Sequence, residues 1–132
     1  MILPKIGEKR TSVVKYSTDK VVNFAKLSGD ENPIHLNEDF AKKSLFGDRI
    51  VHGILVASQI SALLANELPG PGSIYLNQEL KFVNPVYHGE EITCIVEVIE
   101  LKEDKNIIIL NTICKNNNDV VAVIGKAVIK KV

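Results

Sequence analysis

The stretch HGILVASQISALLANEL, residues 52–68, runs directly into PGPG, residues 69–72, and this junction decides the fold. Apolar residues lie on almost every side of a helix built from residues 52–68, and a helix that is apolar all round belongs in a protein interior. The prolines and glycines then end it, because proline lacks the backbone donor that a helix needs and glycine leaves helical angles readily. We therefore predict one long central helix, buried by the rest of the chain.

Beyond this junction the chain changes from helical to β texture. Segments rich in isoleucine and valine cover residues 73–83, 91–101, 106–115 and 120–132, and such residues favour strands. The intervening residues have turn chemistry, and the last two connections are short enough for hairpins. Four strands of a mainly antiparallel sheet are therefore predicted.

The N-terminal half is predicted to add one strand and two short helices. The strand is expected at residues 12–16, the first helix from the Ser17 N-cap to Gly29, and the second from the Asn37 N-cap to a point before Gly47. A loop is expected at residues 30–33, because Pro33 cannot continue the first helix. The predicted class is α+β, with residues 1–132 as one domain in which a curved five-stranded sheet wraps the central helix.

Charge and composition exclude several partners. The 132 residues hold 16 Lys plus Arg against 16 Asp plus Glu, so the positive field that collects nucleic acid is missing. Polar residues such as His52 and Gln59 interrupt the longest apolar stretch, residues 50–68, whereas a membrane span needs about 20 mostly apolar residues. The N-terminus lacks the apolar core of a secretory signal, so we expect a cytoplasmic protein without nucleic-acid or membrane partners.

The β segments also bear on redox state and assembly. Cys94 and Cys114 have no metal-ligand spacing, and a hairpin centred on Asp104 would place them opposite each other; we expect reduced packing residues, a disulfide being the alternative. Residues 120–124 form an apolar strand that would be hazardous at an exposed sheet edge. We therefore predict a homodimer, the alternative being that loops cover the edge.

Asp30 and His35 are the first candidates for chemistry. They stand five positions apart across a proline-stiffened turn in LSGDENPIH, residues 27–35. Side chains converging in this way form a general acid/base pair, because imidazole titrates near neutral pH and a carboxylate can hold or deprotonate a water. Taken alone, the spacing favours the simpler interpretation of a capping aspartate and a solvated loop histidine.

A wider motif connects this loop with a family. Residues 28–35, SGDENPIH, with Ala41 six positions further on, resemble the hydratase motif of the (R)-specific enoyl-CoA hydratases, the MaoC-like dehydratases; residues 50–53 and 69–75 resemble other parts of that family. The resemblance covers essentially the whole chain and is greatest to the short bacterial polyhydroxyalkanoate-type hydratases. It implies a hotdog fold, a homodimer with a continuous sheet, and syn addition of water to a trans-2-enoyl-CoA.

The resemblance also implies roles for residues of this chain. Asp30 and His35 become the catalytic pair, which activates one water and needs no metal or other cofactor. Charge builds on the thioester oxygen as the enolate forms, so a hydrogen-bond donor is needed there. Gly53 is the candidate, since the first N–H groups of the central helix lack internal partners. Its alternative role is to let the chain turn into the helix.

Further residues are expected to bind the acyl-CoA thioester or to shape its site. Asn32 belongs to the motif and stiffens its loop; Ser61 lies near the site in the family, or bonds the preceding helical turn. Arg49 is a candidate contact for the phosphates of coenzyme A. The acyl chain is expected beside Ile54, Ala57 and Leu64, which ordinary core packing explains as well, and His52 and His88 are interpreted as structural.

Two other functions stay open. A hotdog thioesterase would release free coenzyme A, but such enzymes commonly carry a carboxylate on the central helix, and this helix has none before Glu67. A non-catalytic acyl-thioester binding module would bind ligand without turnover, and the intact pair of Asp30 and His35 argues against it.

Overall fold

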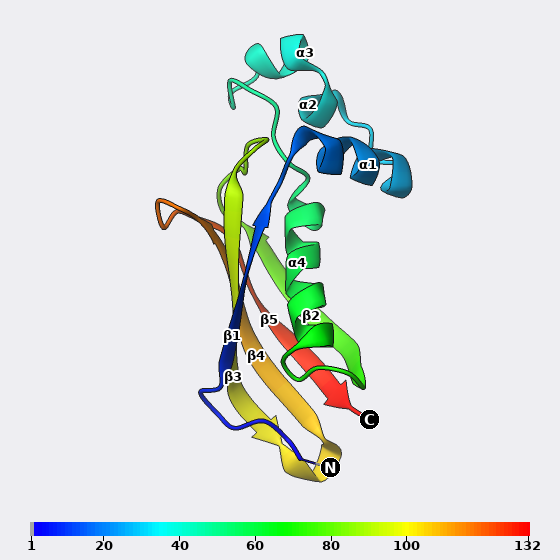
Figure 1. Cartoon of the computed structure of the whole chain (residues 1–132), viewed down its shortest axis with the longest axis vertical. Coiled ribbons are helices and arrows are strands. Elements are labelled where there is room, and N and C mark those ends of the chain that lie inside the picture. Colours follow the sequence, from blue (N-terminus) through cyan, green and yellow to red (C-terminus); the bar gives the residue numbers. More distant parts are fainter. Residues whose placement is uncertain (1) are drawn as a thin grey trace.

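The structure is a computed structural model that describes residues 2–132. Its elements are β1 (Lys9–Lys15), α1 (Thr18–Ser28), α2 (Pro33–Leu36), α3 (Glu38–Lys42), α4 (Gly53–Asn66), β2 (Ser73–Phe82), β3 (Glu91–Lys102), a 3₁₀ turn η1 (Glu103–Lys105), β4 (Ile107–Asn116) and β5 (Val121–Lys131). Figure 1 shows α4 lying along one face of the curved sheet, with α1, α2 and α3 gathered over the end at which α4 begins. The α+β prediction is confirmed, and this arrangement is the hotdog fold that the resemblance implies.

The sheet is antiparallel throughout and has the strand order β1-β3-β4-β5-β2. The apolar strand that contains residues 120–124 would be hazardous at an exposed edge, but it lies inside the sheet: Val123 is opposite Cys114 of β4 on one side and Phe82 of β2 on the other. The connection between β2 and β3, residues 83–90, crosses from the β2 edge of the sheet to β3, and this leaves β2 paired with β5. The edges are therefore β1 and β2, and Ile74 and Phe82 on β2 are about half exposed.

The helix α4 is held against the sheet by apolar packing and by one buried polar group. Val56, Ile60 and Leu64 are fully buried, and burying such a side chain contributes roughly 1.5–3 kcal/mol. The amide of buried Gln59 donates to the Ile92 carbonyl and to Ser12 Oγ, each at 3.0 Å, and accepts from the Tyr16 hydroxyl at 2.8 Å. These bonds fix α4 lengthwise on β1 and β3.

The sequence predicts that α4 is buried on all sides, but only the side that faces the sheet is buried. Ile54 is 57% exposed, and Ala62 and Ala65 are also exposed. The isolated chain thus leaves one side of its central helix uncovered, and the apolar residues of this exposed stripe are Ile54, Ala62 and Ala65.

The N-terminal segments follow the prediction with two differences. Ser17 caps α1, and Gly29 ends it with a left-handed φ of 81°. The strand β1 begins at Lys9 rather than at residue 12, because its pairing with β3 continues that far. The predicted loop ends at Asn32 and not at Pro33, since proline is favourable at the first position of a helix and here starts α2.

Two further predictions concern the state of the cysteines and the lack of a membrane span. Cys94 and Cys114 lie opposite each other on β3 and β4, as the hairpin prediction requires, and both are buried and free. Within residues 2–132, no helix combines the length and the apolar character needed to cross a membrane.

Candidate active site

A mainly apolar cavity of about 360 Å³ lies where α4 begins. It brings together Asp30, His35, Gly53 and Ile54 from the predicted site residues. Phe46, Phe82 and Val123 are among the apolar side chains that complete the wall. A few polar groups in an apolar concave wall are typical of a small-molecule site.

Asp30 and His35 reach the cavity from the two ends of the short connection between α1 and α2. Gly29 ends α1, after which the Asp30 amide donates to Ser28 Oγ at 3.1 Å, and Asn32 accepts from the Ile34 amide at 3.2 Å as the cap of α2. The side chain of Asp30 is exposed, whereas that of His35 is buried. One carboxylate oxygen of Asp30 lies within 4.8 Å of a ring nitrogen of His35, a gap that one water molecule can bridge.

The hydrogen bonding of His35 determines which of its ring nitrogens faces the reaction. Nδ1 lies 2.9 Å from the carbonyl oxygen of Ile50, which can only accept, so Nδ1 carries the proton. In the neutral ring, Nε2 then keeps a free lone pair. Burial lowers the pKa of His35 from its usual 6.5, and the neighbouring His52 lowers it further, while the Ile50 carbonyl and Asp30 oppose the change. The lowered pKa favours the neutral form of the His35 ring at pH 7.

The lowered histidine pKa values predict acid destabilisation. Burial, followed by the charge of Arg49, also lowers the pKa of His88. The unfolded chain, whose histidines titrate near 6.5, binds more protons than the folded chain once the pH falls below that value. We expect the free energy of unfolding to be highest above pH 6.5 and to fall as the pH drops below it. Urea denaturation at a series of pH values would measure this, and His88→Gln should flatten the slope; equal slopes in both proteins would contradict the assignment.

Gly53 is the first residue of α4, so its N–H has no acceptor within the helix. His52, at the N-cap, makes no side-chain capping bond, which leaves the first amides of α4 available at the cavity. The ring of Phe82 packs against the glycine: a Cβ added to Gly53 would lie 2.5 Å from Phe82 Cδ1. The site therefore combines an open helix N-terminus with a residue that only glycine can occupy without moving the wall.

Asp30, His35 and His52 are also the described residues that come nearest to a metal-ligand set, since their ligand atoms lie within 4.8 Å of one another. Backbone carbonyls already occupy His35 Nδ1 and His52 Nε2. The two rings stack with centroids 3.8 Å apart and planes at 26°. The lone pairs left for a water or another ligand beside Asp30 are therefore those of His35 Nε2 and His52 Nδ1.

The other predicted site residues lie outside this cavity. Ala57 and Ser61 line a second, open groove between α4 and β2, which shares Ile54 with the cavity. Asn32 is engaged in capping α2. Leu64 is buried in the core, as its packing interpretation expects. Arg49 approaches the Leu36 carbonyl at 3.5 Å and is not among the residues that line either space.

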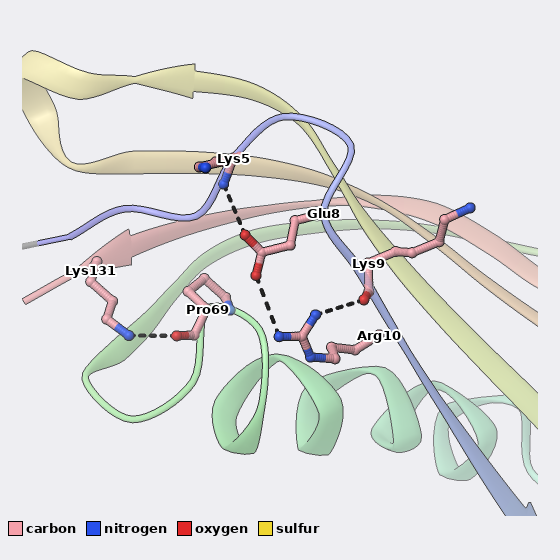
Figure 2. Close-up of polar contacts among 6 residues, drawn as sticks. All are labelled: Lys5, Glu8, Lys9, Arg10, Pro69 and Lys131. Atoms are coloured by element: carbon pink, nitrogen blue, oxygen red, sulfur yellow. Dashed lines mark hydrogen bonds and ion pairs between the residues drawn. The ribbon is translucent and has the colours of Figure 1, made fainter.

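The second arginine of the chain is remote from the site. Arg10 donates to the Lys9 carbonyl at 2.9 Å and pairs with Glu8, which also accepts from the Lys5 amide (Figure 2). These contacts involve the start of β1, at the end of the sheet near the N-terminus (Figure 1). The residues that line the cavity include Gly53 and Ile54, at the start of α4. Arg49 is therefore the nearer of the two arginines to the site.

The sequence analysis missed two contributors to the site. His52 was interpreted as structural, yet it contacts both Asp30 and His35. Phe82 was assigned only to a strand, yet its ring lies on Gly53. The adjacency of His52 and Gly53 in the sequence was the available signal for the first; the second depends on the pairing of β2 with β5, which no local pattern predicts.

The chain is similar to known proteins over nearly its whole length. The sequence model of one protein family, described as the MaoC like domain, matches residues 4–120. The (R)-specific enoyl-CoA hydratase of Aeromonas caviae is 45% identical over 96% of this chain and 94% of that protein. The (R)-specific enoyl-CoA hydratase of Rhodospirillum rubrum is 42% identical over 96% of this chain and 83% of that protein. A solved structure of an (R)-hydratase from A. caviae involved in PHA biosynthesis has a TM-score of 0.95, with 98% of each chain covered and 44% identity.

Proposed function

The chain belongs to the MaoC-like dehydratase family, and from this premise we propose that it is an (R)-specific enoyl-CoA hydratase. Such a hydro-lyase adds water reversibly to a trans-2-enoyl-CoA and forms the (R)-3-hydroxyacyl-CoA. The observation that carries the proposal is the convergence of Asp30 and His35 on one cavity at the start of α4. The helix α4 carries no carboxylate, which weighs against the thioesterase alternative.

In the proposed reaction, one water lies between the Asp30 carboxylate and His35 Nε2. Its oxygen forms the new bond to Cβ as one of its protons passes to the pair, and the pair returns a proton to Cα. Both new bonds form on the same face, because water and proton come from the same two groups. The free lone pair on His35 Nε2 makes this nitrogen the acceptor that we favour for the first proton.

The electrons of the double bond move onto the thioester oxygen while Cβ is attacked, and they return when Cα is protonated. We assign the Gly53 N–H to this oxygen, because it has no intrahelical acceptor and the helix dipole favours negative charge at this end. The absence of a side chain at Gly53 lets the Phe82 ring pack against the start of α4, which completes the wall beside this N–H.

Turnover of crotonyl-CoA tests the proposal. The absorbance of the conjugated thioester should fall on addition of protein, and chiral analysis should give the (R)-3-hydroxy product. A thiol reagent in a parallel reaction should detect no release of coenzyme A; rapid release would favour the thioesterase, and binding without either change would favour a non-catalytic module.

We also propose that the working unit is a homodimer. The exposed apolar stripe on α4 and the half-exposed edge strand β2 adjoin each other along the open groove. A partner there would cover Ile54 and Tyr75 and would pair the free edge of β2. Light scattering of the purified chain should report twice the monomer mass, and a monomer at micromolar concentration would contradict this.

The substrate contacts outside the cavity are proposals of the same kind. We assign the acyl chain to the path from Ile54 past Ala57 to Ser61, since the cavity and the groove share Ile54. Arg49 is assigned to the phosphates of coenzyme A, Asn32 to shaping the loop, and the protein to the cytoplasm. Relative activity with enoyl-CoAs of increasing length would map the acyl path, and localisation of a tagged chain would test the compartment.

A further inference from the structure

His52 touches both members of the proposed catalytic pair without belonging to the motif that contains them. It immediately precedes Gly53 and is the N-cap residue of α4. Its side chain is 2% exposed and makes no capping bond. The ring is turned instead toward the Asp30 turn and α2, so a single side chain connects three segments of the site.

The first contact holds Asp30 through its backbone. His52 Nε2 lies 2.9 Å from the carbonyl oxygen of Asp30, an obligate acceptor, so Nε2 carries the proton. The other bonds of this turn, from the Asp30 amide to Ser28 and from the Asn32 amide to Asp30, stay within five residues. They shape the turn but do not relate it to α4. The bond from His52 does so, and the Asp30 side chain itself is exposed.

The second contact holds His35 through the face of its ring. The two imidazoles stack with centroids 3.8 Å apart, and Phe24 of α1 meets His52 edge-on at 4.9 Å. His35 is thereby fixed at two points, by the Ile50 carbonyl at Nδ1 and by His52 against its face. If the His35 ring rotated about its hydrogen bond to the Ile50 carbonyl, it would lose its stacking contact with His52.

A water shared by two groups is activated only if both are held at the correct separation, and small displacements cost rate steeply. We propose that His52 is a positioning residue that sets the separation of Asp30 and His35, holding the first by its carbonyl and the second by its ring face. The proposal rests on the proposed function for its catalytic meaning, but the two contacts exist independently of it.

Two substitutions separate the contacts. His52→Phe retains a ring that can stack on His35 but removes the donor to Asp30; His52→Gln retains an N–H near the position of Nε2 but removes the ring. With crotonyl-CoA, we expect His52→Phe to lower kcat by about 10- to 100-fold with little change in KM. His52→Gln should lie between this variant and the wild type. Ile60→Val, a buried change on the same helix, is the control for lost packing alone and should retain the wild-type kcat.

A second readout does not depend on turnover. The charged groups that influence the pKa of His35 are His52 and Asp30; His35 in turn influences the pKa of His88, beside which Arg49 and Asp48 also lie. Since His52 lowers the pKa of His35, both substitutions should move the His35 titration to higher pH. The Cε1–H resonance of His35 would report this by NMR, assigned by its loss in His35→Asn.

The outcomes are distinguishable. A wild-type kcat in His52→Phe, or a loss no larger than that caused by Ile60→Val, would overturn the positioning role. An unchanged His35 titration in both His52 variants would overturn it as well. If the wild type does not hydrate crotonyl-CoA but the titration moves as expected, the proposed function fails and the coupling of His52 to His35 stands.

Discussion

Replacing Asp30 with asparagine should lower kcat for the hydration of crotonyl-CoA by about 10²- to 10⁴-fold, the contribution usual for a positioned acid or base. Asparagine has the same shape and still offers an Oδ1 to the Asn32 amide, so the turn should fold unchanged. It carries no charge and is a poor proton acceptor at neutral pH, so the shared water loses one of its two activating groups. Stopped-flow or steady-state absorbance of the enoyl thioester would measure the loss.

His35→Asn is the matched substitution on the other side of the water. The asparagine Nδ2 can replace Nδ1 in the bond to the Ile50 carbonyl, while the reacting nitrogen Nε2 is removed. We expect a loss similar to that of Asp30→Asn, and a double variant little worse than either, because groups that act as a unit are not additive. Near-complete activity in either single variant would remove that residue from the mechanism.

Glu31→Gln is the control for the loss of a carboxylate beside the motif. Glu31 is exposed and is not among the residues that line the cavity. Its substitution should leave kcat and the midpoint of urea unfolding unchanged. A large effect of Glu31→Gln would mean that the net charge of the loop, rather than the position of Asp30, supports the reaction.

The local parts of the fold were predictable because they depend on neighbouring residues. The caps Ser17 and Asn37 and the stop at Gly29 act within one helical turn, and the structure uses all three as expected. The pairing of Cys94 with Cys114 followed from hairpin arithmetic about Asp104 and is also confirmed. Short-range chemistry decides such features before any tertiary contact forms.

The strand order was not predictable in the same way. The sequence left open whether the apolar residues 120–124 lie at a sheet edge, and the structure places β2 beside them. The pairing of β2 with β5 joins segments about 50 residues apart and depends on the whole sheet. For the same reason, the contact of Phe82 with Gly53 and the open side of α4 were visible only in three dimensions.

The site residues fall into the same two groups: some belong to short sequence motifs, and others are recognised only from their tertiary contacts. Asp30, His35 and Gly53 lie in short motifs and were singled out by sequence, and the structure brings all three to one cavity. His52 was interpreted as structural because it lies outside the pair of Asp30 and His35 and no third ligand type stands at metal spacing in the sequence. What distinguishes it is the combination of a carbonyl at 2.9 Å and a stacked ring at 3.8 Å, from two segments of the chain that precede it by about 20 residues.

The largest expected loss of stability comes from Gly125→Ala, in the middle of β5. Gly125 lies between Thr112 of β4 and Leu80 of β2. A Cβ at this position would lie 1.8 Å from the carbonyl oxygen of Glu79 and 2.9 Å from Gln78 Nε2. The nearest atom belongs to the backbone, so β2 itself must move away. We expect a loss of about 2–4 kcal/mol in the free energy of unfolding, at the upper end for overpacking, from urea denaturation.

The side chain of Gln78 also crosses over Gly125. The amide of Gln78 donates to Thr112 Oγ1 at 3.1 Å and to the Glu79 carbonyl at 2.8 Å, and thereby links β2 to β4 over the intervening strand. If the glutamine alone were in the way, Gln78→Ala would restore the stability of Gly125→Ala. We expect no such rescue, because the Glu79 carbonyl remains; recovery of stability in the double variant would show that β2 tolerates the extra methyl group.

Gly47→Ala is the comparison that separates collision from backbone strain. Gly47 has a left-handed φ of 76°, but a Cβ there would meet nothing within 4 Å. Its substitution should cost only the roughly 1–2 kcal/mol of a strained backbone. Gly125→Ala should cost more and should also lower activity, because the displaced strand β2 carries Phe82 into the wall of the cavity beside Gly53. Equal losses of stability in the two variants, with activity intact, would show that the wall is independent of the β2–β5 pairing.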